Sequence, residues 1–559
     1  MRPVISIGNQ DFQSIRENQR FYVDKTALIK EWWENGDVVT LITRPRRFGK
    51  TLNMSMLEQF FSNQYAGRSD LFEGLSIWEE KSYRELQGSY PVISLSFAAV
   101  KGTTYAEARE SIQQVLLDLY AKFEFLRQGD ALNSREKEYF DYVEKDMSNS
   151  VAAMALHRLA LCMNRYYGKK ALIFLDEYDT PLQEAYVHGY WEELTSFMRS
   201  LFNAAFKTNP YLERGILTGI TRVRKESIFS DLNNLEVVTT TSRKYETAFG
   251  FTEKEVAQAL ETFGMAGQMG QVKKWYDGFR FGGRDDIYNP WSITKYLDAG
   301  RLDSYWANTS SNSLVGKLIK EGTPGLKMAM EDLLEGKQIE TAIDEEIVFD
   351  QLADSDAAVW SLLLASGYLK VMEAPEEGVG GIYSLALTNY EVEKMFRRMI
   401  QEWFQNASVR YNDFVKALLS DDVEYMNEFM NQIAFQTFSS FDVGKMPSDF
   451  AEPERFYHGF VLGLMVDLSD QYRITSNRES GFGRYDIVLE PLAAGRNAYV
   501  IEFKVRRPGK EKNLEETVWN ARRQIEEKGY DAELTARGIP KERIRHYGFA
   551  FEGKRVLIG

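Results

Sequence analysis

The segment from residue 38 to 61 constrains the fold of this chain more than any other stretch. A short apolar run, Val38–Thr43, leads into Arg-Pro-Arg-Arg-Phe-Gly-Lys-Thr at 44–51, and a helix-like stretch follows at 52–61. A strand, a loop ending in Gly-Lys-Thr and a helix, in this order, match the phosphate-binding pattern G-x-x-x-x-G-K-[ST]. The pattern predicts a sheet in which one strand carries such a loop at its carboxyl end.

Each residue of the loop has an expected task. Gly49 lets the backbone approach phosphate oxygens at a helix N-terminus, Lys50 reaches the β- and γ-phosphates, and Thr51 is a ligand of Mg²⁺. Arg44 departs from the pattern, because it occupies the place of the first glycine. Pro45 can fix the turn instead, since its φ angle is preset.

A second apolar run, Ala171–Leu175, ends in Asp176 and Glu177. At the carboxyl edge of a parallel sheet, Asp176 is expected to hold Mg²⁺, and Glu177 is expected to polarise an attacking water. A strand that ends in Asp-Glu is also an ordinary strand cap. The phosphate-loop pattern earlier in the chain favours the functional interpretation.

A third apolar run ends near Thr218, and the basic segment Thr-Arg-Val-Arg-Lys follows it at 221–225. We expect Thr218 to sense the γ-phosphate. Arg222 or Arg224 is expected to stabilise charge on the transferred phosphoryl group, as arginine fingers do. A solvated basic loop explains the two arginines equally well.

The chain of 559 residues is long enough for two to four domains. Strand-like and helix-like segments alternate in the first half, which predicts a parallel sheet covered by helices on both faces. The pattern is mostly helical from about 252 to 403, with loops expected at 281–286 and 373–381. A further α/β segment starts near 452. We therefore expect an ATPase-type domain at 1–250, a helical connector at 251–403 and a third domain at 404–559 with its core at 452–559.

Composition excludes several classes of site. The single cysteine, Cys162, excludes an internal disulfide framework, and four scattered histidines argue against a histidine metal centre. The net charge is −14, but residues 452–559 carry 19 basic against 17 acidic residues, a net +2, which leaves −16 for the remainder. A separate C-terminal domain is expected from this contrast. With no signal-like segment and no long apolar run, we expect a cytoplasmic protein that does not bind membranes.

Two adjacent strand-like runs near the C-terminus carry charged residues. Asp486 lies on one, and Glu502 and Lys504 lie two positions apart on the next, so the latter two face the same side. Two carboxylates and a lysine on one face can hold a divalent metal and orient a water for phosphodiester attack. An edge strand with solvated charges is the alternative, but AYVIEFKV is otherwise apolar. Glu454, on a preceding helix, is a candidate further metal ligand, and Glu479 is its alternative.

Six motifs in order make the first half similar to the prokaryotic AAA-ATPase-like P-loop proteins: FYVDKTALIKE, RPRRFGKT, LIFLDEYDTPL, LTGITRVRKESIFSDLNNL, WYDGFRFG and YNPWSI. The resemblance implies ATP binding through Gly49, Lys50 and Thr51, with Asp176 and Glu177 as the Walker B pair. The Arg-Pro-Arg-Arg-Phe-Gly-Lys loop is a trait of that family. The resemblance gives no roles to Tyr276-Asp277-Gly278 and Tyr288-Asn289-Pro290.

Residues 452–551 resemble the PD-(D/E)XK nuclease superfamily. The resemblance implies a catalytic set of Asp486, Glu502 and Lys504, with Glu454 on the helix. No proline precedes Asp486, and the helical Gln524 is spaced differently from Tyr530 than in the Gln-x-x-x-Tyr motif of some relatives. Four basic residues after the strand are candidate phosphate contacts, with a solvated loop as the alternative: Arg506, Arg507, Lys510 and Lys512.

Taken together, the sequence predicts an ATP-binding and ATP-hydrolysing protein coupled to a nuclease that uses Mg²⁺ or Mn²⁺. DNA is expected ahead of RNA as partner, and a homo-oligomer is the candidate assembly. The alternative is a nucleotide-regulated signalling or defence switch whose nuclease-like domain binds nucleic acid without cutting it. Arg44, Arg46 and Arg47 are expected to contact nucleotide or a neighbouring subunit.

Overall fold

A computed structural model gives the positions of most of the chain. It describes residues 2–221, 228–229, 232–307, 313–344, 352, 355–374, 381–405, 411–437, 461, 465, 468, 471–476, 479–480, 483–484, 486–493, 495–553 and 555–559. These residues form two compact units. The first comprises Met1–Val315 and Gln338–Glu393, and the second comprises Gly316–Lys337 and Lys394–Gly559. The domain boundaries after 250 and 403 stay predictions.

A five-stranded parallel sheet organises the first unit, in the order β2-β3-β4-β1-β5. Its strands are β1 (Val39–Thr43), β2 (Val92–Ser96), β3 (Ala171–Asp176), β4 (Leu212–Gly219) and β5 (Leu235–Val238). Every residue of β1 and β3 is buried, as expected for continuous apolar runs in a sheet covered on both faces. Because β4 lies between β1 and β3, the polar residues at the ends of these three strands share one edge of the sheet.

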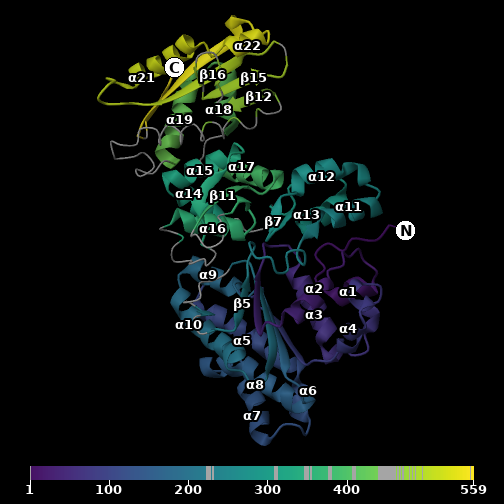
Figure 1. The fold of residues 1–559 in the computed structure, drawn as a ribbon. Coiled ribbons are helices and arrows are strands. Elements are labelled where there is room, and N and C mark those ends of the chain that lie inside the picture. The colour runs from purple at the N-terminus through teal and green to yellow at the C-terminus, as the bar shows by residue number, and fades with distance from the viewer. Residues whose placement is uncertain are drawn as a thin grey trace. The chain divides into compact units, whose positions relative to one another are not determined.

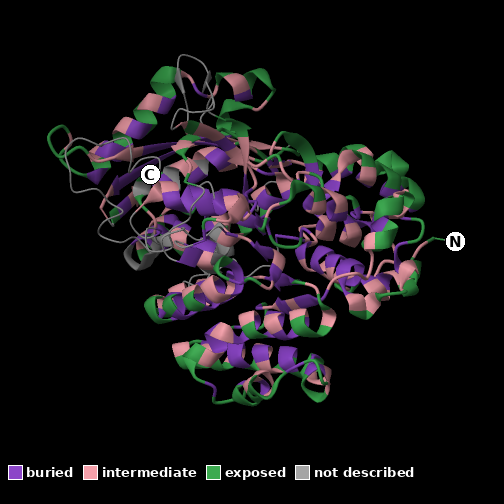
Figure 2. Cartoon of the chain, turned by 60° about the horizontal axis from the view of Figure 1, so that its bottom comes forward, coloured by how far each residue is buried: buried purple, intermediate pink, exposed green. Residues whose placement is uncertain are grey.

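Helices cover both faces of this sheet. Figure 1 shows α1 to α4 on one side and α5, α9 and α10 on the other. Figure 2 shows that their buried residues gather on the faces turned inward, whereas the outer faces are exposed. The helices are α1 (Phe12–Glu17), α2 (Ala27–Asn35), α3 (Lys50–Phe61), α4 (Lys81–Leu86), α5 (Tyr105–Lys122), α6 (Glu124–Gln128), α7 (Ser134–Tyr142), α8 (Asn149–Tyr167), α9 (Thr180–His188) and α10 (Trp191–Phe202).

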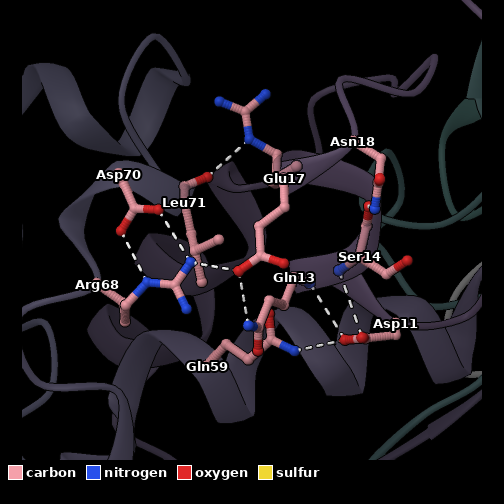
Figure 3. Close-up of polar contacts among 10 residues, drawn as sticks. Asp11, Gln13, Ser14, Glu17, Asn18, Gln59, Arg68, Asp70 and Leu71 are labelled. Carbon is pink, nitrogen blue, oxygen red and sulfur yellow. Dashed lines mark hydrogen bonds and ion pairs between the residues drawn. The ribbon is translucent and has the colours of Figure 1, made fainter.

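A polar cluster fastens α1 to α3, the helix that follows the phosphate loop (Figure 3). Asp11 caps α1 by accepting from two of its backbone N–H groups, and it also accepts a 2.7 Å hydrogen bond from Gln59 of α3. Arg68 forms ion pairs with Glu17 at 2.7 Å and with Asp70 at 2.9 Å. The Asp11–Gln59 bond thus joins the C-terminal part of α3 to the start of α1, and the Arg68 pairs join α1 to the segment that follows α3.

The middle of the chain is mostly helical but also holds two small antiparallel sheets, β6-β8-β7 and β10-β11-β9. Its elements are β6 (Phe251–Thr252), α11 (Glu253–Thr262), α12 (Met269–Tyr276), β7 (Phe279–Phe281), β8 (Arg284–Tyr288), α13 (Pro290–Ala299), α14 (Ser313–Glu321), α15 (Pro324–Leu334), β9 (Ile339–Ala342), α16 (Asp356–Ala365), β10 (Leu369–Glu373), β11 (Ile382–Leu387) and α17 (Tyr390–Gln405). The loop expected at 281–286 is wrong. Most of it belongs to the β7–β8 hairpin, where Gly282 supplies the positive φ of a tight turn.

A second five-stranded sheet, in the order β12-β15-β16-β17-β18, organises the second unit. Its central strand β16 (Ala498–Val505) runs antiparallel to β15 (Ile487–Pro491) and parallel to β17 (Ile544–Glu552). The odd residues of β16 pack into an apolar cluster with α18 and α19, and its even residues face α21. The other elements are α18 (Tyr411–Leu419), α19 (Val423–Thr437), β12 (Tyr472–Ser476), β13 (Glu479–Ser480), β14 (Gly483–Arg484), α21 (Leu514–Lys528), α22 (Ala532–Ala536) and β18 (Arg555–Ile558).

No helix within the described ranges is both long enough and apolar enough to span a bilayer.

Candidate functional site

The phosphate loop joins β1 to α3 in a conformation that needs two positive φ angles. Gly49 has φ +83° and caps α3, which begins at Lys50. Arg47 has φ +65°, which is uncommon for a residue with a side chain. At the start of the loop, the Arg44 N–H donates to the Gly219 carbonyl at the end of β4 at 3.0 Å. The loop is thus attached to the neighbouring strand before it turns away from the sheet.

Three of the predicted nucleotide-site residues meet at one carboxylate. Asp176, which is 4% exposed at the end of β3, accepts a 2.7 Å hydrogen bond from the Thr51 hydroxyl on one oxygen. The Thr218 hydroxyl, at the end of β4, donates to its other oxygen. Thr51 of the loop, Asp176 at the end of β3 and Thr218 at the end of β4 therefore lie together. A hydroxyl and a carboxylate at this point are the oxygen ligands that Mg²⁺ prefers.

Lys50 is nearly buried and folds over its own loop. Its ammonium donates to the Arg44 and Pro45 carbonyls, both at 2.8 Å. Burial lowers the pKa of Lys50, and the nearby carboxylates of Asp176 and Asp179 oppose that shift. The Lys50 ammonium therefore bonds two carbonyls of its own loop and lies near the carboxylates of Asp176 and Asp179.

Glu177 also has a positive φ angle, +52°. Its carboxylate accepts a 3.1 Å hydrogen bond from the Thr180 hydroxyl at the start of α9. A strained backbone of this kind persists only where its surroundings hold it, and such residues gather at functional sites. The side chain is partly exposed next to Asp176.

Arg44 does not have the expected role. Its side chain is 0% exposed, so it contacts neither solvent nor a neighbouring subunit, and that prediction is wrong. The guanidinium donates to the Thr43 carbonyl at 2.9 Å and the Thr239 carbonyl at 2.6 Å, and lies 4.6 Å from the Phe281 ring centroid. Burial lowers the pKa of Arg44 to about 9. This arginine ties the end of β1 to the segment after β5.

Three predicted residues lie outside the described ranges. They are Arg222 and Arg224, which follow β4, and Glu454, the third proposed carboxylate of the C-terminal site.

Asp179 is a buried residue of the same site that sequence reasoning missed. Its carboxylate accepts hydrogen bonds from the Ile220 and Thr221 N–H groups and from the Thr221 hydroxyl, all at 2.9 Å. It therefore fixes the turn after β4 against the end of β3. A Cβ atom on Gly219 would lie 2.8 Å from this carboxylate, which explains the glycine there. The only sequence signal was the second aspartate of Asp-Glu-Tyr-Asp.

The Tyr-Asn-Pro motif has a structural explanation at the tip of the phosphate loop. Asn289, fully buried, caps α13 through its side-chain oxygen, while its amide donates to the Arg46 carbonyl at 3.3 Å. The Trp306 indole N–H donates to the same carbonyl at 3.0 Å. Residues about 250 positions away thus hold the loop. Sequence alone gave no sign of either contact.

The Tyr-Asp-Gly motif positions the start of β7. Gly278 has φ +121°, and a Cβ atom there would lie 2.0 Å from the Thr388 carbonyl, so only glycine fits. The Tyr276 hydroxyl donates to the Asp303 carbonyl at 2.9 Å. Asp277 lies among the carboxylates of Glu253 and Asp286, where burial raises its pKa to about 7.

These three carboxylates already have a cation of the chain itself. Lys273 pairs with Glu253 and lies 3.4 Å from Asp286 and 3.8 Å from Asp277. The Lys273 ammonium therefore offsets part of the negative charge of the cluster.

The C-terminal candidate residues gather on one face of the second sheet. Ile487 of β15 pairs with Ile501 of β16, which sets Asp486 opposite Glu502. Asp486 accepts a 2.7 Å hydrogen bond from the Phe503 N–H. Glu502 is 3% exposed, and the Lys504 ammonium lies 4.0 Å from it on the same side of β16. Burial of the Glu502 carboxylate is costly unless a cation and hydrogen bonds compensate it; Lys504 and the next helix supply them.

Gln524 of α21 connects the two charged residues. Its amide donates to Glu502, and its carbonyl oxygen accepts a 2.7 Å hydrogen bond from Lys504. The amide also lies 3.2 Å from the Tyr530 hydroxyl. The altered Gln–Tyr spacing does not separate the two side chains, because Tyr530 follows the end of α21 and turns back toward it. We therefore include Gln524 in the candidate site.

The basic residues after β16 divide into two groups. Arg506 pairs with Glu552 and donates to the Lys512 carbonyl at 2.8 Å, so it holds the following loop in place. Arg507, Lys510 and Lys512 belong to that loop, and all three are exposed. Of the four candidate phosphate contacts, these three are therefore accessible to a partner.

Comparison with known proteins matches two separate segments of the chain. The model of the family described as predicted AAA-ATPase matches residues 6–229, and the model of the PD-(D/E)XK nuclease superfamily matches residues 452–559. An uncharacterized protein in the vnfD 5′ region of Azotobacter chroococcum mcd 1 is 26% identical over 556 residues, which are 96% of this chain and 95% of the relative. The two resemblances expected from sequence motifs are thereby confirmed.

Proposed function

Because this chain joins a domain of the predicted AAA-ATPase family to a domain of the PD-(D/E)XK nuclease superfamily, we propose that it binds and hydrolyses ATP and cleaves nucleic-acid phosphodiesters with a divalent metal. The observation that carries the proposal is the convergence of side chains at each predicted site. Thr51 and Thr218 meet on Asp176, and Gln524 joins Glu502 to Lys504.

At the first site, ATP brings its phosphates and Mg²⁺ to the loop. The N–H groups at the start of α3 bind phosphate oxygens, and Lys50 donates to the β- and γ-phosphates in place of the Arg44 and Pro45 carbonyls. Thr51 and Asp176 are the residues that would hold the metal, since their oxygens suit it. Glu177 accepts a hydrogen bond from the attacking water and orients it toward the γ-phosphate.

At the second site, Asp486 and Glu502 are the residues that would hold Mg²⁺ or Mn²⁺, because two carboxylates from adjacent strands offer oxygen ligands only. The metal would supply Lewis-acid activation of the phosphate and of the nucleophilic water. Lys504 stabilises negative charge on the phosphoryl oxygens, and Gln524 fixes the direction of its ammonium. Glu454 remains a proposed further ligand.

Two variants with matched controls test the proposal. Lys50→Ala should abolish ATP binding in calorimetry, whereas Lys122→Ala on the exposed face of α5 should not. Lys504→Ala should abolish metal-dependent cleavage, whereas Lys528→Ala, at the exposed last position of α21, makes the same charge change and should leave cleavage intact. Nucleic-acid binding without cleavage by the wild type would favour the regulated switch instead.

The assay should present single- and double-stranded DNA and RNA, with and without ATP. The choice of DNA ahead of RNA, homo-oligomeric assembly and the cytoplasm as location stay predictions.

A further inference from the structure

The tip of the phosphate loop is supported by residues from the middle of the chain. The Arg46 carbonyl accepts hydrogen bonds from the Trp306 indole at 3.0 Å and from the Asn289 amide at 3.3 Å. A carbonyl oxygen has two acceptor positions, so two donors fix its direction. The peptide plane in the centre of the loop is therefore held by these two side chains.

The flanking loop residues are held in the same way. The Arg47 guanidinium lies 4.3 Å from the Trp291 ring centroid. Phe48 packs edge-on against Phe279, with the two ring centroids 4.8 Å apart. The positive φ of Arg47 requires such support, because this conformation is unfavourable for a residue with a Cβ atom. The loop conformation thus depends on elements outside the parallel sheet.

One buried carboxyl group organises these supports. Glu391 is 0% exposed. One of its carboxyl oxygens accepts a 2.6 Å hydrogen bond from the backbone N–H of Trp306. Its other oxygen accepts from the Ser292 hydroxyl at 2.8 Å, in the first turn of the helix that Asn289 caps. Glu391 therefore supports both donors to the Arg46 carbonyl. It bonds the backbone of Trp306 directly, and it bonds α13, the helix that Asn289 caps.

Glu391 belongs to the first turn of α17, and this helix crosses between the compact units. The division falls between Glu393 and Lys394, so α17 begins in the first unit and continues as part of the second. In an α-helix each backbone N–H bonds the carbonyl four residues earlier, so the first turn of α17 is hydrogen-bonded to the turn that follows it. The network around Glu391 is thus covalently continuous with the unit that holds the nuclease-like sheet.

We propose that Glu391 is a positioning residue that couples nucleotide binding at the phosphate loop to α17. This inference rests on the proposed ATP binding. Occupation of the loop by ATP favours the ordered Arg46–Trp306–Glu391 chain and so orders the start of α17. Coupling of this kind is reciprocal. A substitution at Trp306 or Glu391 that breaks these hydrogen bonds therefore weakens ATP binding.

The first test compares two tryptophans that are both 1% exposed. Trp306→Phe removes the donor to the Arg46 carbonyl and keeps the aromatic packing. Trp32→Phe removes an equivalent indole donor, which bonds the Thr40 hydroxyl within β1 at 3.3 Å. Calorimetry with MgATP should show about fivefold weaker binding for Trp306→Phe, the effect of one lost hydrogen bond, and unchanged binding for Trp32→Phe. Equal affinities in the wild type and both variants would overturn the positioning role.

The second test measures hydrogen exchange in the peptide 390–405 of the full chain. MgATP should slow exchange there in the wild type, and Glu391→Gln should lose this slowing while still binding ATP at saturating concentration. A wild type that binds ATP with no change in α17 refutes the coupling and leaves the proposed function standing. A wild type that binds no ATP refutes both.

Discussion

Restoring the missing glycine of the phosphate loop should destabilise the protein. Arg44→Gly recreates the usual pattern, so sequence comparison alone would suggest an improvement. The Arg44 guanidinium, however, is completely buried and donates to four carbonyl oxygens. The acceptors belong to Thr43, Thr239, Lys244 and Tyr245.

The magnitude follows from the two short bonds, at 2.9 and 2.6 Å. A hydrogen bond from a charged donor contributes about 1.5–3 kcal/mol, so the two together contribute about 3–6 kcal/mol. Removal of the charge also relieves its desolvation, which lowers the pKa of Arg44 to about 9. We therefore expect Arg44→Gly to lower the free energy of local opening of β1 by about 3 kcal/mol, the low end of this range.

Hydrogen exchange in a peptide covering Val39–Thr43 measures this quantity. A loss of about 3 kcal/mol speeds exchange through local opening roughly 100-fold. Arg47→Gly is the matched control, because it makes the same substitution in the same loop at φ +65°, where glycine is favoured. It should change exchange less than about fivefold, an effect below 1 kcal/mol. Wild-type exchange rates in Arg44→Gly, or equal acceleration in Arg47→Gly, would refute the structural role of Arg44.

Three further predictions concern Glu391, Gly278 and Gln524. Burial raises the pKa of Glu391 from 4.5 to about 7, so the folded protein holds a proton that the unfolded chain releases; stability should fall by about 3 kcal/mol as the pH rises from 4.5 to 7. Urea titrations should show a smaller fall in Glu391→Gln, and an identical pH dependence in the variant would contradict this. Gly278→Ala should lower the melting temperature far more than Gly36→Ala, because the added Cβ would meet the Thr388 carbonyl at 2.0 Å but nothing closer than 3.9 Å at Gly36; equal melting temperatures would be inconsistent with that clash. Gln524→Ala should slow cleavage about tenfold and shift its pH profile while nucleic-acid affinity is retained, since Lys504 loses its acceptor; an unchanged profile would remove Gln524 from the site.

Local patterns were enough to predict the large elements and the candidate residues at their ends. Val39–Thr43 and Ala171–Leu175 are short, largely apolar runs, and they are buried as expected for strands inside a sheet covered on both faces. Since parallel strands end at one edge, Thr51, Asp176 and Thr218 could be expected to meet there. The β7–β8 hairpin was missed because β7 has only three residues and β8 begins with three exposed charged residues, 284–286, which do not suggest a strand.

Contacts between distant segments could not be predicted in this way. The Arg46 carbonyl is bonded by side chains 243 and 260 residues further along the chain, and neither donor belongs to a recognisable motif for that task. Arg44 was misjudged for the same reason, because an arginine in a loop is normally exposed. Its burial depends on carbonyls from the segment after β5 that only the folded chain brings together.

Cleavage of labelled nucleic acid by the full chain tests the central claim most directly. The wild type, Lys504→Ala and Lys50→Ala are incubated with Mg²⁺ or Mn²⁺, each with and without ATP. We expect metal-dependent cleavage by the wild type that responds to ATP, no cleavage by Lys504→Ala, and cleavage without an ATP response by Lys50→Ala. Equal cleavage by the wild type and Lys504→Ala would contradict the proposed nuclease site.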